Sequence, residues 1–394
     1  MNLKIKPNGY LLLGITVWRL ILTGLAFLAS HLFKYGQNYT PTFPYSNLLL
    51  DEKVWPGWLA RWANFDGVHY LTIVHQGYQG LGLIQAFFPV FPLSILAVTK
   101  LGIDPLIGGQ LISLLALTIS LFIWQGIIKH LFPKTPMAFF WFVIITLLWP
   151  VSFFFIGVYT ESLFFLFLSL SIYWAIKKRW WLAALSTGLL TGTRITGVAF
   201  VPGLILMFLG DQWSIKQLIT AFKHNWLKSF ALAAVAGWGL ILYCYYLYLN
   251  FGDPFLFSHV QSEFGAGRES HFLLFPQAWW RATKVLWTAR PFDFKYWTYF
   301  QDWFFGSVSF FGLIWLWKKI PPSIWLFSCL AILLPISTGS FSSLPRYALI
   351  AVGFHLGLAG LFTHRPKLGI VYLLGSTILL IINVMLFLQG KWVA

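Results

Sequence analysis

Acidic side chains are scarce in this chain of 394 residues, which holds 11 Asp and Glu against 27 Lys and Arg. Charged residues of both signs make up only 10% of the sequence, whereas 58% of it is hydrophobic. This composition excludes an ordinary soluble domain, in which about a quarter of the residues are charged. The sequence therefore predicts an all-α polytopic membrane protein.

Cysteine is also nearly absent. Cys244 and Cys329 both lie inside apolar runs, which excludes a disulfide framework and a thiolate metal site.

The sequence has no soluble basic domain, so its net charge of +16 does not indicate a nucleic-acid partner. The first apolar run, 10–33, is too long for the core of a signal peptide and is expected to be a retained span. No inverted repeat of the transporter kind is visible.

Long apolar segments account for most of the chain. A helix needs about 20 apolar residues to cross a bilayer, and eleven segments are predicted to do so. The run 83–101 is not among them, because Pro89 and Pro92 interrupt its start. It is interpreted as a re-entrant or interfacial helix. The predicted spans cover 9–31, 105–128, 137–157, 161–176, 180–193, 195–210, 228–250, 301–317, 322–339, 345–363 and 367–389.

The distribution of charge supports this topology. If 83–101 does not cross, the short loops rich in Lys and Arg all fall on the side of Lys4 and Lys6, as the positive-inside rule requires. Of the 11 acids, only Asp211 lies there. The excess of positive charge predicts an attraction to anionic membrane lipids. The chain is expected to form a single transmembrane domain, 1–394, with two long external segments, 34–103 and 251–300.

Asp66 stands out in the first external segment. It precedes an amphipathic run, so helix N-capping and general-base catalysis at the membrane surface both fit it. His69 and Tyr70 would share its helix face. His69 next to Asp66 suggests a metal ligand pair, but a third ligand is not evident. Interfacial packing with a polar tip in water is the alternative for His69.

Three further ionisable residues lie at predicted outer ends of spans. Glu161 follows Tyr159 and opens a span, so it is either an electrostatic cap or an acid that faces a cavity. Arg194 separates two short apolar segments, where it either snorkels to the headgroups or holds a phosphate. Arg346 follows Pro345 at a helix start, where the helix dipole disfavours a cation. Its position therefore indicates an anionic partner.

Six segments resemble, in the same order, the PIG-V-like mannosyltransferases of the GT-C superfamily of membrane glycosyltransferases. One departure is Phe65, because the family typically has Trp before the loop acid. The similar segments are 65–78, 86–93, 150–165, 193–197, 252–261 and 345–349.

The resemblance implies a GT-C-type bundle of about 11 transmembrane helices. It also implies transfer of mannose from a polyprenyl-phosphate (dolichyl-phosphate-like) donor to a lipid or glycan acceptor, as in GPI-anchor biosynthesis. The reaction would take place on the non-cytosolic face of the plasma membrane in a prokaryote, or of the ER membrane in a eukaryote. Asp66 matches the catalytic acid of the superfamily's first loop.

Sugar transfer from a phosphate-linked donor is compatible with the small number of acidic residues. A phosphate leaving group departs without protonation, so an inverting transfer needs one base rather than the two carboxylates of hydrolysis. It also needs cations where phosphate charge develops. No cofactor is required on this interpretation, although a divalent cation is an open alternative, and a transporter or flippase of lipid-linked sugars is the alternative function. The assigned residues are Asp66 as catalytic base, Arg194 and Arg346 for the donor phosphate, and His69, Tyr70, Tyr159 and Glu161 for the sugar or acceptor.

Overall fold

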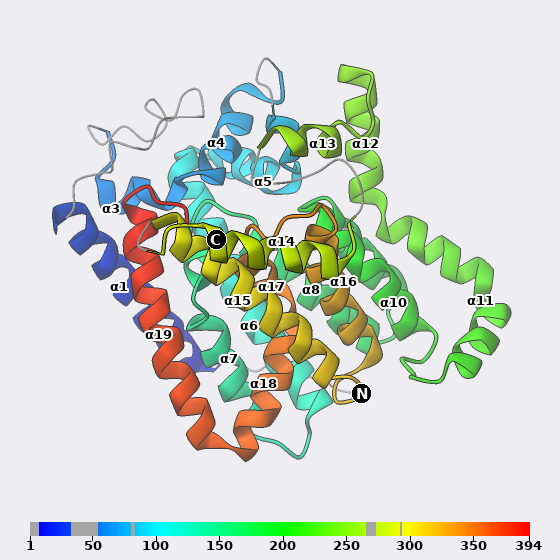
Figure 1. Ribbon diagram of the computed structural model, residues 1–394. Helices are drawn as coiled ribbons and strands as arrows, with labels where there is room; N and C mark the ends of the chain where they lie inside the picture. The colour runs from blue at the N-terminus through cyan, green and yellow to red at the C-terminus, as the bar shows by residue number, and fades with distance from the viewer. Residues whose placement is uncertain (1–7, 33–53, 80–82, 265–272, 292–293) are drawn as a thin grey trace.

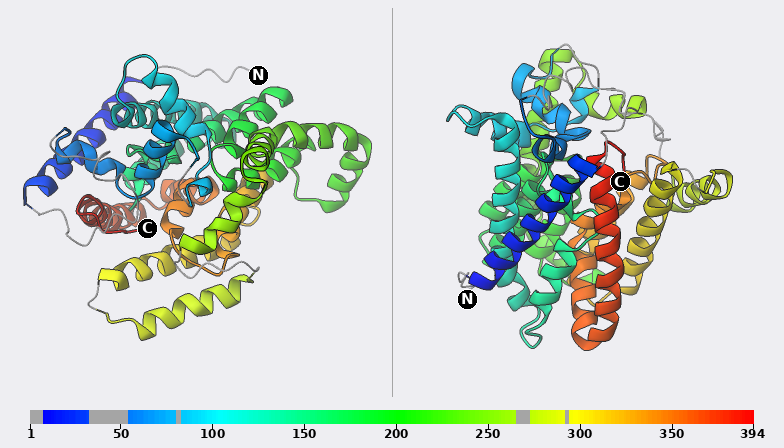
Figure 2. Two further views of the ribbon diagram at one scale, coloured as in Figure 1. Left: turned by 90° about the horizontal axis from the view of Figure 1, so that it is seen from above. Right: turned by 90° about the vertical axis from the view of Figure 1, so that its left-hand side faces the viewer.

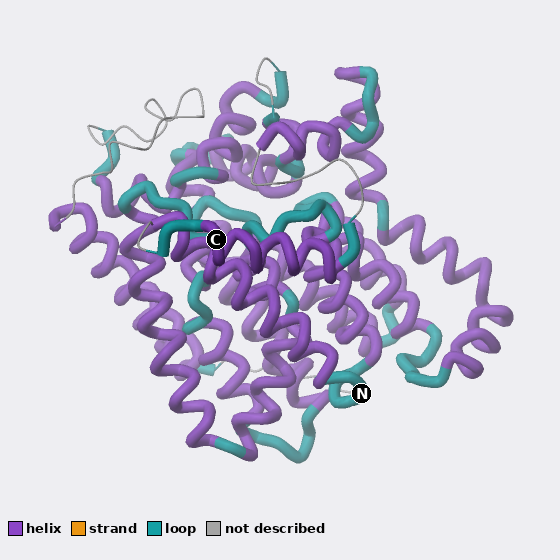
Figure 3. Tube along the Cα trace, viewed as in Figure 1, coloured by secondary structure: helices purple, strands orange, loops and turns teal. Residues whose placement is uncertain are grey.

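The computed structural model describes residues 8–32, 54–79, 83–264, 273–291 and 294–394, and every regular element in them is a helix (Figures 1 and 3). The all-α prediction is confirmed. Three described helices are individually long and apolar enough to cross a membrane: α1 (Gly9–Leu32), α6 (Pro105–Leu131) and α19 (Pro366–Leu388). Two bent pairs raise this number to as many as five. The chain is therefore an integral membrane protein, and the count of eleven spans stays a prediction.

The other helices of the bundle are shorter. The two bent pairs are α11 (Ile215–Ala236) with α12 (Trp238–Phe251), which meet at 56°, and α17 (Leu344–Ile350) with α18 (Val352–His364), which meet at 70°. The remaining ones are α7 (Ala138–Leu147), α8 (Glu161–Ile176), α9 (Trp180–Thr191), α10 (Phe200–Phe208), α15 (Phe294–Trp315) and α16 (Pro322–Ile336).

Three predicted spans are interrupted in the structure. The segment 228–250 bends by 56° where α11 ends and α12 begins. The segment 137–157 is not one helix, because α7 ends at Leu147, before Pro150, and only the 3-10 turn η3 (Ser152–Phe155) follows. Proline removes a backbone donor and clashes with the preceding turn. The segment 345–363 breaks at Ala351, whose ψ of 69° is not helical. The interruptions in 137–157 and 345–363 place irregular backbone next to the same end of the bundle.

Aspartate side chains satisfy backbone donors at the starts of two helices. Asp104 accepts a hydrogen bond from the Leu106 backbone N–H at 2.8 Å, and Pro105 occupies the first turn of α6. Asp211 accepts from the backbone N–H and the hydroxyl of Ser323, both at 2.8 Å, at the start of α16. Asp211, the one acid on the predicted lysine-rich side, therefore caps a helix.

The segment 34–103, whose external position stays a prediction, carries short helices in its described part. Its described part contains α3 (Gly57–Ala60), η1 (Arg61–Ala63), α4 (Asp66–Gln76), η2 (Ile84–Ala86) and α5 (Val90–Thr99). In Figure 1 the helices α3, α4 and α5 lie across one end of the bundle. The second external segment adds α13 (Leu256–His259), η5 (Val260–Phe264) and α14 (Phe275–Thr288) at that end. The short α5 agrees with an interfacial or re-entrant position for 83–101.

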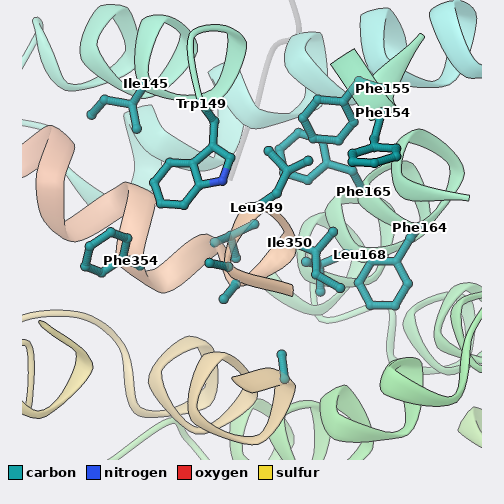
Figure 4. Close-up of a cluster of buried hydrophobic side chains, with 14 of the residues drawn as sticks. Ile145, Trp149, Phe154, Phe155, Phe164, Phe165, Leu168, Leu349, Ile350 and Phe354 are labelled. Carbon is teal, nitrogen blue, oxygen red and sulfur yellow. The ribbon is translucent and has the colours of Figure 1, made fainter. Parts of the chain in front are cut away.

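The core beneath this end is unusually aromatic (Figure 4). Phe154, Phe155, Phe164 and Phe165 are fully buried around the start of α8. Trp149 donates from Nε1 to the Pro345 carbonyl at 3.0 Å, which ties α17 to this cluster. Rings of this size fix a helix position because they fill the space between backbones without voids.

Arg19, in the first span, has a structural partner. Its guanidinium donates to the Gln110 side chain at 3.2 Å and lies 5.8 Å from the Trp62 ring. Gln110 in turn donates to the Leu59 carbonyl at 3.0 Å. Arg19 thus links α1, α6 and the first external segment. The helix α1 also lies beside α19, as Figure 2 shows.

A close crossing of α9 and α12 yields a stability prediction. A Cβ atom on Gly239 would lie 2.1 Å from the Gly188 carbonyl oxygen and 2.6 Å from the Gly192 nitrogen. We expect Gly239→Ala to force these backbones apart at a cost of about 1–3 kcal/mol and to lower the thermal unfolding temperature in detergent. Gly237→Ala is the matched control, since its Cβ would find no atom nearer than 3.5 Å. Equal unfolding temperatures for the two variants would contradict this packing.

Candidate active site

Four ionisable side chains from distant parts of the chain meet at the end of the bundle covered by α4. Asp66 is the first residue of α4, Glu161 is the first residue of α8, and Arg194 lies between α9 and η4 (Ile195–Ala199). Arg346 is in the first turn of α17. The sequence assigned all four to the candidate site, and the structure brings them together.

Glu161 is the centre of this cluster. Its Oε1 accepts from Arg194 Nη1 at 2.5 Å and from Arg346 Nε at 2.9 Å, and it forms an ion pair with Arg346 Nη2 at 2.7 Å. The Glu161 side chain is fully buried. A buried carboxylate between two guanidinium groups reduces their repulsion and allows them to lie side by side.

Asp66 completes the cluster from the other side. Its Oδ2 accepts from Arg346 Nη1 at 2.7 Å. Asp66 is 25% exposed, whereas Arg346 is 5% exposed and Glu161 is 0% exposed. The four charges cancel, and the cluster is open at Asp66 and, to a smaller extent, at Arg194, which is 13% exposed. The guanidinium of Arg346 therefore has one edge bound to a buried anion and one edge bound to an accessible one.

The starts of α4 and α8 test whether these two acids cap their helices through a side-chain hydrogen bond. The N-cap residue of α4 is Phe65, and no side-chain capping bond is made there. The N-cap residue of α8 is Thr160, again without a side-chain capping bond. Both carboxylates bind guanidinium groups instead. The N-capping interpretation of Asp66 is therefore wrong.

The backbone before Asp66 is held in place on several sides. Tyr159 donates from its hydroxyl to the Asn64 carbonyl at 2.5 Å, and the Asn64 amide donates to the Phe387 carbonyl at 3.0 Å. Phe65 has a φ of 58°, a left-handed conformation that a non-glycine residue adopts only when its surroundings enforce it. These contacts bring the first residue of α4 to the first residue of α8.

A cavity of about 330 Å³ opens beside the cluster. Asp66, Arg194 and Arg346 line it, so a ligand there reaches both guanidinium groups and the carboxylate. Aromatic and aliphatic side chains form most of the remaining wall, and hydroxyl and amide groups complete it. These further lining residues are Phe65, Tyr70, Ala86, Phe87, Phe88, Thr193, Ile195, Gln261, Ser342, Ser343, Tyr347 and Trp392.

Comparison with known proteins gives a limited result. No family model matches the chain, and no curated protein matches it. Among solved structures, the chain is similar to the crystal structure of ArnT from Cupriavidus metallidurans bound to undecaprenyl phosphate, with 11% sequence identity and a TM-score of 0.48. The match covers 95% of this chain and 76% of that one. The likeness to PIG-V-like enzymes stays a prediction.

The residues expected to contact sugar or acceptor occupy different places. Tyr70 lines the cavity, but His69, Tyr159 and Glu161 are not among the lining residues. The His69 ring stacks on Phe87 with centroids 4.3 Å apart, and Tyr159 lies under the Arg346 guanidinium at 5.0 Å. In the described part of the chain, no three His, Cys, Asp or Glu side chains are grouped to hold a metal ion.

Sequence reasoning missed Trp392. It follows the last helix, in a segment that carries neither periodicity nor a motif, yet it lines the cavity and lies 5.5 Å from the Arg346 guanidinium. Gln261, Ser342 and Ser343 were also unassigned. Gln261 ends one of the six segments that resemble the family, so a signal existed for it, whereas none existed for Trp392.

The shared carboxylate makes Glu161 a determinant of stability. Glu161→Gln removes the buried negative charge that contacts both guanidinium groups, and breaking such a buried pair costs about 3–5 kcal/mol. We expect a marked fall in the thermal unfolding temperature in detergent. Glu263→Gln, at an exposed position of η5, is the control and should leave the temperature unchanged. A Glu161→Gln protein as stable as this control would show that the cluster is not held by charge.

Proposed function

We propose that this chain is a membrane glycosyltransferase that takes a sugar from a polyprenyl-phosphate donor and transfers it to an acceptor hydroxyl. The observation that carries the proposal is one cavity wall that joins a partly exposed carboxylate, Asp66, to two guanidinium groups, Arg194 and Arg346. On the resemblance to PIG-V-like enzymes, the sugar is mannose and the acceptor is a lipid or a glycan.

The two arginines suit the phosphate of the donor. When the bond between the anomeric carbon and the phosphate oxygen breaks, the electron pair stays on the phosphate, which gains negative charge. Guanidinium groups stabilise that charge with paired hydrogen bonds. Glu161 holds Arg194 and Arg346 through one oxygen atom, so the clamp is already assembled before a ligand enters.

Asp66 suits the role of general base. The acceptor oxygen attacks the anomeric carbon from the face opposite the phosphate, and its proton passes to the Asp66 carboxylate. One carboxylate is sufficient, because the phosphate leaves without a proton, and the configuration at the anomeric carbon is inverted. A base at this place must be within hydrogen-bond reach of the acceptor, and Asp66 is the one acid among the described residues that line the cavity.

A phosphate must compete with Asp66 for Arg346. The Nη1 atom of Arg346 is bound to Asp66, whereas its Nε and Nη2 atoms are bound to the buried Glu161. An incoming phosphate reaches only the Nη1 edge, because Glu161 is fully buried behind the guanidinium. Donor binding therefore separates Asp66 from Arg346 and leaves the carboxylate available to the acceptor.

The cavity wall also suits a lipid-borne ligand. Phe87, Phe88, Ile195 and Tyr347 give it apolar surface next to the guanidinium groups, a combination that fits the first isoprene units beside a phosphate. The site lies at the end of the bundle that the long external segments cover, away from the lysine-rich loops in the predicted topology. We therefore place the reaction on the non-cytosolic face of the membrane.

Asp66→Asn separates catalysis from binding. The variant cannot accept the acceptor proton, so transfer from polyprenyl-phosphate-mannose should be abolished in a reconstituted assay. Because the competing anion is gone, sugar-free polyprenyl phosphate should bind about threefold to tenfold more tightly, as measured by calorimetry or fluorescence in detergent. Asp253→Asn is the control, since Asp253 binds His259 and the Phe255 N–H. Retained transfer by Asp66→Asn would remove Asp66 from the mechanism.

Arg346→Gln tests the phosphate clamp. Charge-assisted hydrogen bonds are worth about 1.5–3 kcal/mol each, so polyprenyl phosphate should bind at least about tenfold more weakly. Arg346→Lys keeps the charge but not the forked geometry and should recover only part of the affinity. Lys284→Gln, on the amphipathic helix α14, is the control for overall charge. Unchanged affinity in Arg346→Gln would place the lipid phosphate elsewhere.

A further inference from the structure

The segment after α19 returns across the candidate site. The Trp392 carbonyl accepts a hydrogen bond from the Thr298 hydroxyl at 2.9 Å, which anchors the segment to α15. Val393 and Ala394 are fully buried. Trp392 itself is half-buried, and its side chain lines the cavity. The backbone at Trp392 is therefore fixed, while part of its side chain faces the cavity.

The indole of Trp392 is fixed by its neighbours as well. The ring meets Phe65 edge-on, with centroids 5.0 Å apart and planes at 74°. The Arg346 guanidinium lies 5.5 Å from its centroid. Phe65 directly precedes Asp66, so the indole adjoins both the candidate base and the candidate phosphate clamp.

This position is where the transferred sugar would lie in the proposed reaction. The anomeric carbon is bonded to the phosphate oxygen, so it must lie one bond from the group held by Arg194 and Arg346. The acceptor approaches the same carbon from the side of Asp66. The sugar ring therefore occupies the space beside Arg346 and Asp66, which Trp392 borders.

We propose that Trp392 is the platform for the sugar ring and a determinant of sugar specificity. This inference rests on the proposed function. A pyranose presents C–H bonds on one face, and their partial positive charge is attracted to the negative face of an aromatic ring. An indole offers the largest aromatic face among protein side chains. The contacts of Trp392 with Phe65 and Arg346 already fix the ring, so sugar binding does not have to order it. Trp392 thus contacts the sugar and not the phosphate.

The alternative role of Trp392 is packing alone. Arg346 also lies over the rings of Phe154 at 4.5 Å and Tyr159 at 5.0 Å, and it is bound to two carboxylates. Its position therefore does not depend on Trp392. A packing role would affect sugar-free and sugar-loaded lipids equally, whereas a platform affects only the sugar-loaded lipid. The ratio of the two dissociation constants in one protein distinguishes these roles.

The experiment measures the affinities of sugar-free polyprenyl phosphate and of polyprenyl-phosphate-mannose for the full chain in detergent. In Trp392→Ala, the affinity for the mannose-loaded lipid should fall about tenfold, and that for the sugar-free lipid should change less than about threefold. Trp392→Phe keeps a smaller aromatic face and should recover part of the loss. Trp287→Ala, an exposed tryptophan on α14, is the matched control and should change neither affinity.

The outcomes distinguish failure of the sugar platform from failure of the proposed function. If Trp392→Ala weakens both lipids equally, or neither, the sugar platform is overturned while the proposed function stands. If the unaltered chain binds no polyprenyl phosphate, the proposed function itself fails and the platform fails with it. Because the ratio is taken within each variant, a partly unfolded preparation lowers both binding capacities and leaves the ratio unchanged.

Discussion

The carboxylate of Glu161 is the point on which the candidate site depends. Two guanidinium groups side by side in a protein interior repel each other and lose their hydration, and each effect alone would open the structure. Glu161 counters both, because one buried oxygen lies within ion-pair distance of three guanidinium nitrogens and accepts hydrogen bonds from two of them. The start of α8, the turn after α9 and the start of α17 are therefore held in one arrangement by a single anion.

Helix ends are what bring these groups together. Asp66 and Glu161 each open a helix, and Arg346 is in the first turn of α17. A cation in a first turn is unfavourable because the helix dipole is positive there. The two carboxylates bound to Arg346 and the ring of Phe154 beneath it offset this cost. The break of α17 and α18 at Ala351, with a bend of 70°, lets α17 begin at the cavity.

Much of the site follows from the sequence, and the reasons are physical. Asp66, Arg194 and Arg346 were predicted to lie on one side of the membrane. An ionisable group at the end of an apolar segment is costly inside the bilayer, so it lies at the membrane surface or in a polar cavity. The bounds of α8 were predicted correctly, since Lys177 and Thr160 flank a continuous apolar run. The predicted spans 137–157, 228–250 and 345–363 were wrong as single helices, because a hydropathy profile does not detect a helix break inside an apolar stretch.

Other features of the site depend on which remote parts of the chain meet in the fold. No local sequence pattern predicts those contacts. The sequence suggested that Glu161 faces a cavity, but its position behind Arg194 and Arg346 depends on how α8 meets α17. Trp392 reaches the site only because α19 packs beside α1 and ends below α4 in the view of Figure 1. An aromatic residue after a last span is otherwise typical of a membrane interface, so its place at the cavity was not predictable.

The charge balance of the cluster links binding to catalysis. In the structure the two arginines and the two acids sum to zero, so a phosphate adds a charge that this cluster of four does not neutralise. On the proposed mechanism, the exposed partner, Asp66, gives up Arg346, because the buried Glu161 has no access to water. The arrival of the donor therefore frees the carboxylate for the acceptor, and an acceptor that enters an empty site meets a carboxylate still bound to arginine.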